Sequence, residues 1–330
     1  MSQRLRGAIV GTGSYAPPKV LSNFDLMKLV ETTDEWIVQR TGVRERRMVA
    51  DGETPASMGI AAAKSALENA GMTADQLDLI ICGTVSGDLV FPATACLIQA
   101  GLEISEIPCF DVSAACSGFI YALAVADGMI ATGLYRNVLV VASDALTRFT
   151  DYTDRGSCIL FGDAAGAVVL RATDDPLKGQ QYCNIGARGS GWDFIHVPAG
   201  GSRTPASSQT VEARQHYIQM RGRDVYKFAV QQMAGLMADG MDKCGLKVED
   251  VDLVIPHQVN QRIIESATSK LEFPLDKVFV NIDRYGNTSG ASIPLALDQA
   301  HRAGRTPPGS TLLLVAFGAG LTWGASVLKM

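Results

Sequence analysis

The cysteines of this 330-residue chain lack every pattern that a disulfide framework or a zinc site requires. There are seven, an odd number, and none forms a Cys-x-x-Cys pair or a cluster with histidine at metal-ligand spacing. We therefore expect reduced thiols, no bound metal ion and a cytoplasmic location.

Basic charge and long apolar runs are also scarce. The net charge of −5 argues against general binding to nucleic acid or to an anionic membrane surface. No run approaches the ~20 apolar residues that a membrane span needs, and no signal segment precedes the first expected strand at residues 7–11. With 47% hydrophobic residues the chain can bury a large core, as one big domain or two ordinary ones. We expect no membrane and no nucleic acid among its partners.

Three segments predict local structure. A strand at residues 8–11 leads into Gly11-x-Gly13-x-x-Ala16, but prolines follow where a dinucleotide-binding helix would begin, so a tight turn is the favoured interpretation. Residues 157–161 and 165–170 predict two strands joined by a hairpin turn. Residues 174–214 are polar, rich in glycine and without periodicity, which indicates a boundary or an excursion.

An internal repeat organises the chain. Residues 78–81 and 252–255 are similar apolar strands separated by 174 positions (252 − 78), and each follows an amphipathic helix, a glycine and a short acidic connection. The strand, turn and small-residue helix around Cys116 have a counterpart around Asn287. A duplicated α/β unit, with halves at 1–174 and 175–330, explains this better than two unrelated domains. Chance similarity of two α/β halves is the alternative.

Cys116 stands at the junction between an expected strand and the helical segment 119–130. Unpaired backbone N–H groups and the helix dipole at such a junction favour the thiolate, so we predict a lowered thiol pKa and a nucleophile. A cysteine that only packs in the core is an equally common alternative for this stretch alone.

Two polar residues are expected to join this thiol. His257 ends an apolar strand, and Asn287 lies in a glycine-flanked turn. If the halves are related by a pseudo-twofold axis, the segments that follow equivalent strands converge, and the three side chains meet. Cysteine, histidine and asparagine in this order also describe papain-like proteases, but the nucleophile motif of those enzymes is absent.

The chain resembles the β-ketoacyl-acyl carrier protein synthase III family along essentially its whole length. The resemblance rests on the motifs at residues 35–42, 114–118, 153–156, 257–264, 286–294 and 316–324. It implies a thiolase-like α/β fold of two duplicated halves with α/β/α/β/α layers. It further implies an acyltransferase that condenses an acyl-coenzyme A primer with malonyl-acyl carrier protein, releases carbon dioxide and initiates type II fatty acid synthesis.

The same resemblance implies roles for individual residues. Cys116 carries the acyl group, His257 and Asn287 donate to the malonyl thioester oxygen, and the backbone N–H groups of Cys116 and Ala319 bind the oxyanion. No cofactor is implied, because acyl-coenzyme A is a substrate. The remaining implied positions are Thr32, Trp36, Arg40, Arg155 and Asn260 for coenzyme A, Lys227, Arg262 and Lys270 for the acidic carrier protein, and Phe91 and Ile218 for the acyl pocket, Phe91 reaching the neighbouring subunit of a homodimer.

Other functions remain as alternatives to this condensing enzyme. The nearest is a related condensing enzyme that makes a secondary metabolite or a polyketide starter. A thiolase is less favoured because residues 315–330 contain no second cysteine. A catalytically dead scaffold that binds carrier protein is disfavoured because all three reactive positions are intact. The sequence does not determine the acyl primer.

Overall fold

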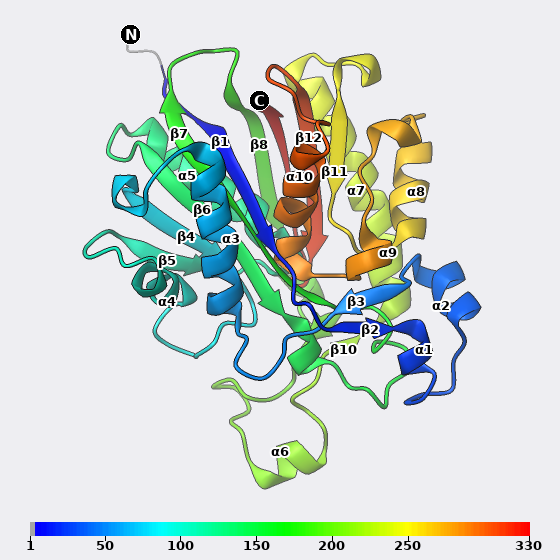
Figure 1. The fold of residues 1–330 in the computed structure, drawn as a ribbon. Coiled ribbons are helices and arrows are strands. Elements are labelled where there is room, and N and C mark those ends of the chain that lie inside the picture. The colour runs from blue at the N-terminus through cyan, green and yellow to red at the C-terminus, as the bar shows by residue number, and fades with distance from the viewer. Residues whose placement is uncertain (1–3) are drawn as a thin grey trace.

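The computed structural model describes residues 4–330, which form two mixed β-sheets with helices between and outside them (Figure 1). The strand order is β1-β7-β6-β4-β5 in the first sheet and β11-β12-β13-β8 in the second. The first sheet consists of β1 (Arg6–Tyr15), β4 (Leu79–Gly83), β5 (Cys109–Val112), β6 (Asn137–Ala145) and β7 (Asp163–Thr173). The second consists of β8 (Gly179–Ala187), β11 (Leu253–Pro256), β12 (Thr311–Gly318) and β13 (Thr322–Lys329).

Helices cover both faces of each sheet. Between the sheets lie α5 (Gly118–Ala131) and α10 (Ser292–Arg302), whose apolar faces share one core with both sheets. The outer face of the first sheet packs on α3 (Pro55–Ala70) and α4 (Thr94–Gly101), and that of the second on α7 (Gly222–Cys244) and α8 (Gln261–Ser269). This α/β/α/β/α layering confirms the predicted fold class.

The two sheets repeat one pairing pattern. In the first, β4 pairs in parallel with β5 and β6, while β7 pairs antiparallel with β6 and β1. In the second, β11 pairs in parallel with β12 and through a Val254–Val278 bridge, while β13 pairs antiparallel with β12 and β8. The chain leaves the first sheet at Thr173 and enters the second at Gly179, on either side of the predicted division. The division into domains at that point stays a prediction.

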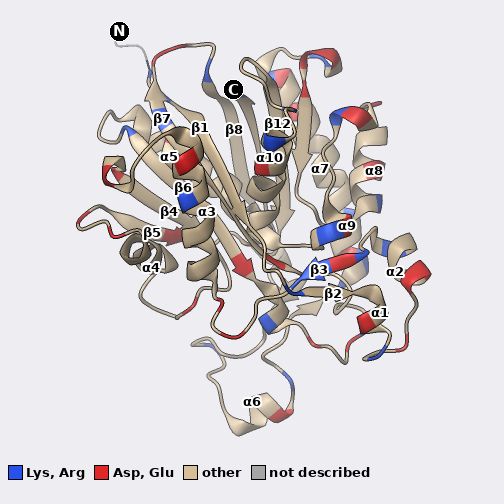
Figure 2. Cartoon of the chain, viewed as in Figure 1, with Lys and Arg blue, Asp and Glu red and all other residues tan. Residues whose placement is uncertain are grey.

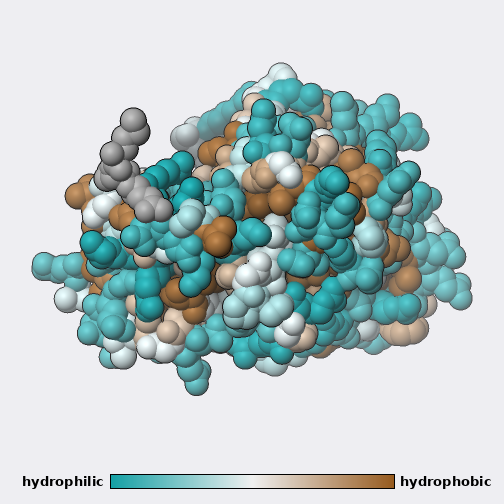
Figure 3. Space-filling model, turned by 90° about the horizontal axis from the view of Figure 1, so that it is seen from above, coloured by the Kyte–Doolittle hydropathy of each residue, from teal (hydrophilic) through white to brown (hydrophobic). Residues whose placement is uncertain are grey.

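The central strands explain why the sheets are buried. β6 is buried along all but its first residue and β12 along its whole length. Both are rich in aliphatic residues, as expected for strands with helices on both faces. Among the described residues no helix is long and apolar enough to cross a membrane. The end of the molecule seen in Figure 3 is covered mostly by hydrophilic side chains, with hydrophobic ones in small groups.

Two excursions leave this core (Figure 1). The first consists of β2 (Val20–Ser22), α1 (Asn23–Leu26), α2 (Asp34–Thr41) and β3 (Glu45–Arg47). The second consists of β9 (Ile195–His196), α6 (Ser208–Glu212) and β10 (Gln219–Met220). The short α9 (Ile282–Tyr285) lies beside β3. The prediction that residues 174–214 are irregular was wrong for β8. This strand lies at the edge of its sheet, and its half-buried polar residues mask the strand periodicity.

Two local predictions were also wrong. Residues 157–161 form turns, not a hairpin strand, and Phe161 bridges to Asn287. Gly11 and Gly13 lie inside β1, not in a turn, because α3 approaches the strand closely there. A Cβ atom at Gly13 would lie 2.3 Å from both Ala62 O and Ala66 N.

Gly13→Ala should therefore destabilise the protein. The added methyl group forces β1 and α3 apart, and overpacking of this kind costs about 1–3 kcal/mol or more. The change is measured as the free energy of unfolding in urea. The control is Gly128→Ala on the exposed face of α5, where no atom lies within 4 Å of the new Cβ. It should leave stability unchanged or raise it by up to about 1 kcal/mol. Equal stability of the two variants would contradict the close-approach explanation.

Candidate active site

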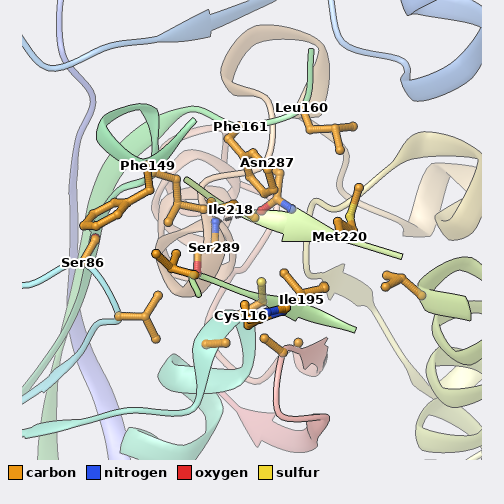
Figure 4. Close-up of a pocket in the computed structure, with 18 of the residues that line it drawn as sticks. Ser86, Cys116, Phe149, Leu160, Phe161, Ile195, Ile218, Met220, Asn287 and Ser289 are labelled. Atoms are coloured by element: carbon orange, nitrogen blue, oxygen red, sulfur yellow. Dashed lines mark hydrogen bonds between the residues drawn. The ribbon is translucent and has the colours of Figure 1, made fainter. Parts of the chain in front are cut away.

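A cavity of about 650 Å³ lies where the two halves meet, and Cys116, His257 and Asn287 all line it. Figure 4 shows Cys116 and Asn287 on its wall. Cys116 lies in the 3₁₀ turn η2 (Ala115–Ser117) before α5, and His257 follows β11. Asn287 lies between α9 and the 3₁₀ turn η7 (Ser289–Ala291). Most of the remaining lining is apolar. The structure thus brings the three expected residues, from different elements of both halves, to one cavity.

The turn that carries Cys116 is held by the loop between β12 and β13. Ala115 has a φ of +47°, an unusual conformation for a residue with a side chain. A Cβ atom at Gly318 would lie 2.7 Å from the Cys116 backbone nitrogen, so only glycine allows this approach. The Thr322 hydroxyl donates to Ala114 O at 2.8 Å and links the two segments. Ala319 lines the cavity next to Gly318, beside the nucleophile turn.

Burial controls the protonation of the Cys116 thiol. It raises the pKa of Cys116 to about 12, and the negative charge of Asp144 raises it further, while a hydrogen bond with the Ser289 side chain lowers it. The prediction that the helix terminus lowers the pKa of the Cys116 thiol was therefore wrong. Cys116 lies in a 3₁₀ turn before α5. The cost of desolvating the thiolate there outweighs the favourable interaction of the thiolate with the helix dipole. Activation of the thiol requires a partner that takes its proton.

His257 is neutral and oriented. Its side chain is fully buried, and this desolvation lowers its pKa to about 3. Nδ1 lies 2.7 Å from Ser292 Oγ, which also accepts from the Gln258 backbone N–H at 3.4 Å. In the tautomer in which Nδ1 accepts the Ser292 hydroxyl hydrogen, Nε2 carries the imidazole hydrogen. Nε2 has no partner among residues 4–330, so it can donate to a ligand.

The Asn287 amide is oriented by its own turn. Its Oδ1 accepts from the Ser289 backbone N–H at 2.9 Å, and its backbone N–H donates to Leu160 O at 2.8 Å. The backbone N–H of Gly162 donates back to Asn287 O at 3.0 Å. With Oδ1 engaged by the backbone, the Nδ2 hydrogens are available toward the cavity.

The residues expected to bind coenzyme A lie outside this cavity, and most of them form a cluster. The guanidinium groups of Arg40 and Arg155 each lie 5.2 Å from the centre of the Trp36 ring. Asn260 follows the cavity residue Val259 and donates to Arg40 O at 2.9 Å. Asn260 therefore links the segment at the edge of the cavity to the aromatic cluster through a hydrogen bond. The Thr32 hydroxyl is buried without a hydrogen-bond partner among the described residues.

The three residues expected to dock a carrier protein are exposed on α7 and α8, which pack together. Lys227 lies on α7 and Arg262 on α8, while Lys270 is the residue that ends α8. None of them has an ion-pair partner in the described chain. Figure 2 shows basic residues on α8 and α9 beside the first excursion.

The two acyl-pocket residues differ in position. Ile218 lines the cavity and packs on Leu146 and Phe161. Phe91 does not line the cavity of its own chain, and 84% of its surface is exposed. Its neighbours Leu89 and Val90 do line that cavity. Phe91 is thus free to contact another molecule.

The sequence analysis missed the residues that hold the three reactive groups. These are Ser292, which lies against His257 Nδ1, Ser289, whose backbone N–H donates to Asn287 Oδ1, and Thr322, whose hydroxyl donates to Ala114 O in the turn that carries Cys116. Serine and threonine in loops are too common to single out. The internal repeat offered one signal for Ser289, because residues 115 and 289 are separated by the same 174 positions as the two similar strands. In the structure both residues have positive φ.

Layered α/β halves with a Cys–His–Asn cavity between them define a thiolase-like condensing enzyme. The family described as 3-oxoacyl-[acyl-carrier-protein (ACP)] synthase III matches residues 110–189, and its C-terminal family matches 241–330. A β-ketoacyl-[acyl-carrier-protein] synthase III of Caldanaerobacter subterraneus subsp. tengcongensis is 47% identical over 329 residues, covering 100% of this chain and 99% of the relative.

Two further relatives agree. The enzyme of the same name from Roseiflexus castenholzii is 49% identical over 322 residues, covering 98% of this chain and 97% of the relative. The crystal structure of 3-oxoacyl-[acyl-carrier-protein] synthase III from Aquifex aeolicus VF5 has a TM-score of 0.90 and 45% identity, covering 98% of this chain and 100% of that one. The chain belongs to the β-ketoacyl-acyl carrier protein synthase III family of acyltransferases.

The buried His257 predicts a pH dependence of stability. Its pKa is lowered in the folded protein, so between about pH 6.5 and pH 3 only the unfolded chain binds the proton, and folding loses free energy as the pH falls. From pH 8 to pH 5 this loss is about 2 kcal/mol. His257→Gln should therefore lose less stability over this interval than the wild type, measured as the free energy of unfolding in urea. Identical pH dependence of both proteins would contradict a neutral, desolvated imidazole.

Proposed function

We propose that this protein condenses an acyl-coenzyme A primer with malonyl-acyl carrier protein, the reaction that begins type II fatty acid synthesis. The observation that carries the proposal is that Cys116, His257 and Asn287, from both halves of the chain, line one largely apolar cavity. Relatives of 47% and 49% identity carry the synthase III name, which does not favour the alternative of a secondary-metabolite enzyme.

In the first half-reaction Cys116 is the acyl acceptor. Its thiol loses a proton, and the sulfur attacks the carbonyl carbon of the acyl thioester. The oxyanion that forms lies between the backbone N–H groups of Cys116 and Ala319 in this proposal. Collapse of the intermediate breaks the bond to the coenzyme A sulfur, which leaves as the thiol. The close approach of Gly318 to the Cys116 nitrogen supports this arrangement, because it brings the two backbone segments together.

In the second half-reaction His257 and Asn287 act as a pair of neutral donors. Loss of carbon dioxide from the malonyl group develops negative charge on its thioester oxygen. The Nε2 hydrogen of His257 and the Nδ2 hydrogens of Asn287 stabilise that charge, and the carbanion then attacks the acyl-Cys116 thioester. The neutral state of His257 supports this role, since it keeps the donor without placing a full charge in an apolar cavity. The products are the 3-ketoacyl carrier protein and free Cys116.

Coenzyme A binds across the aromatic cluster and extends to the cavity in this proposal. The adenine stacks on Trp36 beside Arg155, Arg40 and Thr32 lie close to the nucleotide, and Asn260 contacts the pantetheine arm. The two guanidinium groups already over the Trp36 ring support a site for a flat π-system and for phosphate. Acyl-coenzyme A is consumed as a substrate, and no cofactor enters these steps.

The acidic carrier protein docks on Lys227, Arg262 and Lys270. These side chains are exposed and without ion-pair partners in the described chain, so their charge is available to a partner. Since the overall net charge is −5, a local basic surface is what an acidic partner needs. Their place on adjacent helices next to the residues that lead into the cavity supports delivery of the malonyl arm from this side.

A homodimer completes the proposal. The strand β5 forms an edge of the first sheet, and the loop before α4 exposes 55% of Leu89, 94% of Val90 and 84% of Phe91. An unpaired strand edge beside exposed apolar side chains is a typical association surface. Phe91 of each subunit would then contribute to the acyl pocket of its partner, next to Ile218. A cytoplasmic location fits the seven unpaired cysteines.

Acyl transfer to Cys116 can be tested directly. Incubation with a panel of acyl-coenzyme A esters should add one acyl mass to the wild type and none to Cys116→Ala, measured by intact-protein mass spectrometry. The acyl group that adds fastest also identifies the primer. An acyl adduct that persists in Cys116→Ala would exclude Cys116 as the acceptor.

Carrier docking predicts a selective defect. Arg262→Glu reverses a charge that faces the acidic partner, so kcat/KM for malonyl-acyl carrier protein should fall by roughly ten-fold or more, equivalent to about 1.4 kcal/mol. Acylation of Cys116 by acyl-coenzyme A should stay near the wild-type rate. The matched control is Lys64→Glu, an exposed charge reversal on α3 at the opposite outer layer. Equal loss in both half-reactions, or an equal effect of Lys64→Glu, would refute the docking role.

A further inference from the structure

Two cysteines of the first half lie within reach of each other on neighbouring elements. Cys96 is on α4, and Cys109 begins β5, the strand at the edge of the first sheet. The Cys109 thiol donates to Cys96 Sγ, and the two sulfur atoms are 3.6 Å apart. Both cysteines are unpaired and half-buried. Among residues 4–330 no other two cysteines are joined by a hydrogen bond. The pair has no part in the mechanism proposed above.

Hydrogen bonds on both sides of Cys96 hold α4 against β5. The Asp111 carboxylate on β5 accepts from the first two backbone N–H groups of α4, at 2.6 and 2.8 Å. One turn beyond Cys96, Gln99 Nε2 donates to Ile107 O at 3.2 Å, just before β5 begins. Figure 1 shows α4 beside β5. The fold itself therefore keeps the two thiols close together.

The two thiols face each other in the outer layer of the first half. Cys109 packs on the core that lies between the sheet and the helices α3 and α4. Its neighbours Phe110 and Val112 pack on the core between the two sheets. Because side chains alternate along a strand, the Cys109 thiol points toward α4 and not along the open edge of β5. Neither thiol is fully buried, so a small oxidant has access to the pair.

The separation suits a covalent bond between the two sulfurs. A disulfide has a sulfur–sulfur distance of about 2.05 Å, so the atoms must approach by about 1.5 Å, which rotation of the side chains can supply. Burial and the hydrogen bond with Cys96 raise the pKa of Cys109 to about 11. Cys109 therefore keeps its proton, and Cys96 is the sulfur that reacts first with an oxidant.

We propose that Cys96 and Cys109 are a reversible oxidation site, in which hydrogen peroxide converts the two thiols to a disulfide that fastens α4 to β5. The Cys96 sulfur attacks one peroxide oxygen, the O–O bond breaks, and a sulfenic acid and water form. The Cys109 sulfur then attacks the sulfenic sulfur, and the displaced hydroxyl leaves as water with the Cys109 proton. Two S–H bonds and the O–O bond break, while one S–S bond and two O–H bonds form. Both sulfurs are oxidised and both peroxide oxygens are reduced.

This disulfide would join two segments that border the cavity. The loop before α4 supplies Leu89 and Val90 to the cavity wall, and β5 leads into the turn of Cys116. Neither Cys96 nor Cys109 lines the cavity, so their oxidation leaves the Cys116 thiol itself unmodified. The site needs no acyl group and no carrier protein, so the inference stands apart from the proposed function.

Oxidation of the full-length wild type with hydrogen peroxide tests the site. Free thiols are blocked after unfolding, and a protease specific for acidic residues then cleaves after Asp88, Glu103 and Asp111. The two resulting peptides each contain a single cysteine, Cys96 in the first and Cys109 in the second. Mass spectrometry should find them joined, at a yield roughly ten-fold or more above any other pair of cysteine peptides, because only this pair starts within bonding reach. Dithiothreitol should separate them again.

Serine variants identify the two sulfurs. Cys96→Ser and Cys109→Ser should each abolish the joined peptides, because each removes one sulfur. The matched control is Cys244→Ser, at a half-buried cysteine on α7, which should retain them. If one of the first two variants fails to fold, the other decides alone. A wild type without the joined peptides, or one in which Cys96 is linked mainly to a different cysteine, overturns the proposal.

Electrophoresis without reductant distinguishes a disulfide within one chain from one between two chains. The joined peptides should come from the band of the single chain, since both sulfurs belong to one subunit. Joined peptides that come only from a band of twice that mass would place the bond between subunits and refute the site. The result is read from peptides, so it stays interpretable whether or not Cys116 accepts an acyl group.

Discussion

The contact between the turns before α5 and α10 is the constraint on which the site depends. Ala115 and Ser289 take the same left-handed conformation at equivalent positions of the repeat. A Cβ atom at Gly290 would lie 3.4 Å from Ala115 O, and one at Gly318 would lie 2.7 Å from the Cys116 nitrogen. The contact at Gly290 is ordinary van der Waals packing, whereas a larger residue at Gly318 would push this segment away from the Cys116 turn. The close fit lets a residue from each half face the same cavity, and the buried helices α5 and α10 hold the turns in place.

Desolvation then sets the chemistry of the reactive groups. The apolar cavity makes charge expensive, so it holds His257 neutral and raises the pKa of Cys116. A neutral imidazole is the better donor to a developing oxyanion, but a neutral thiol is a poor nucleophile. The same apolar environment therefore suits the proposed role of His257 as a neutral donor and keeps the Cys116 thiol protonated.

Much of the fold could be predicted from local pattern. The offset of 174 residues between similar strands indicated two equivalent α/β units, and the two sheets share one pairing order. The pattern failed where tertiary contacts override it. Gly11 and Gly13 indicated a turn, but they lie in β1, where the absence of a side chain lets α3 pack closely against the strand. The edge strand β8 carries too many polar residues to show its periodicity, and residues 157–161 pack as turns against the Asn287 loop.

The sequence alone determined which residues are candidates for the site, because a cysteine, a histidine and an asparagine at strand ends are chemically conspicuous. It also determined the duplicated α/β fold, because apolar periodicity is local. Only the tertiary structure decided which hydroxyl lies against His257 and how far burial moves the pKa of Cys116 and of His257. These properties arise from contacts between elements of both halves of the chain, which meet at the cavity. Desolvation and hydrogen-bond geometry exist only once those contacts form.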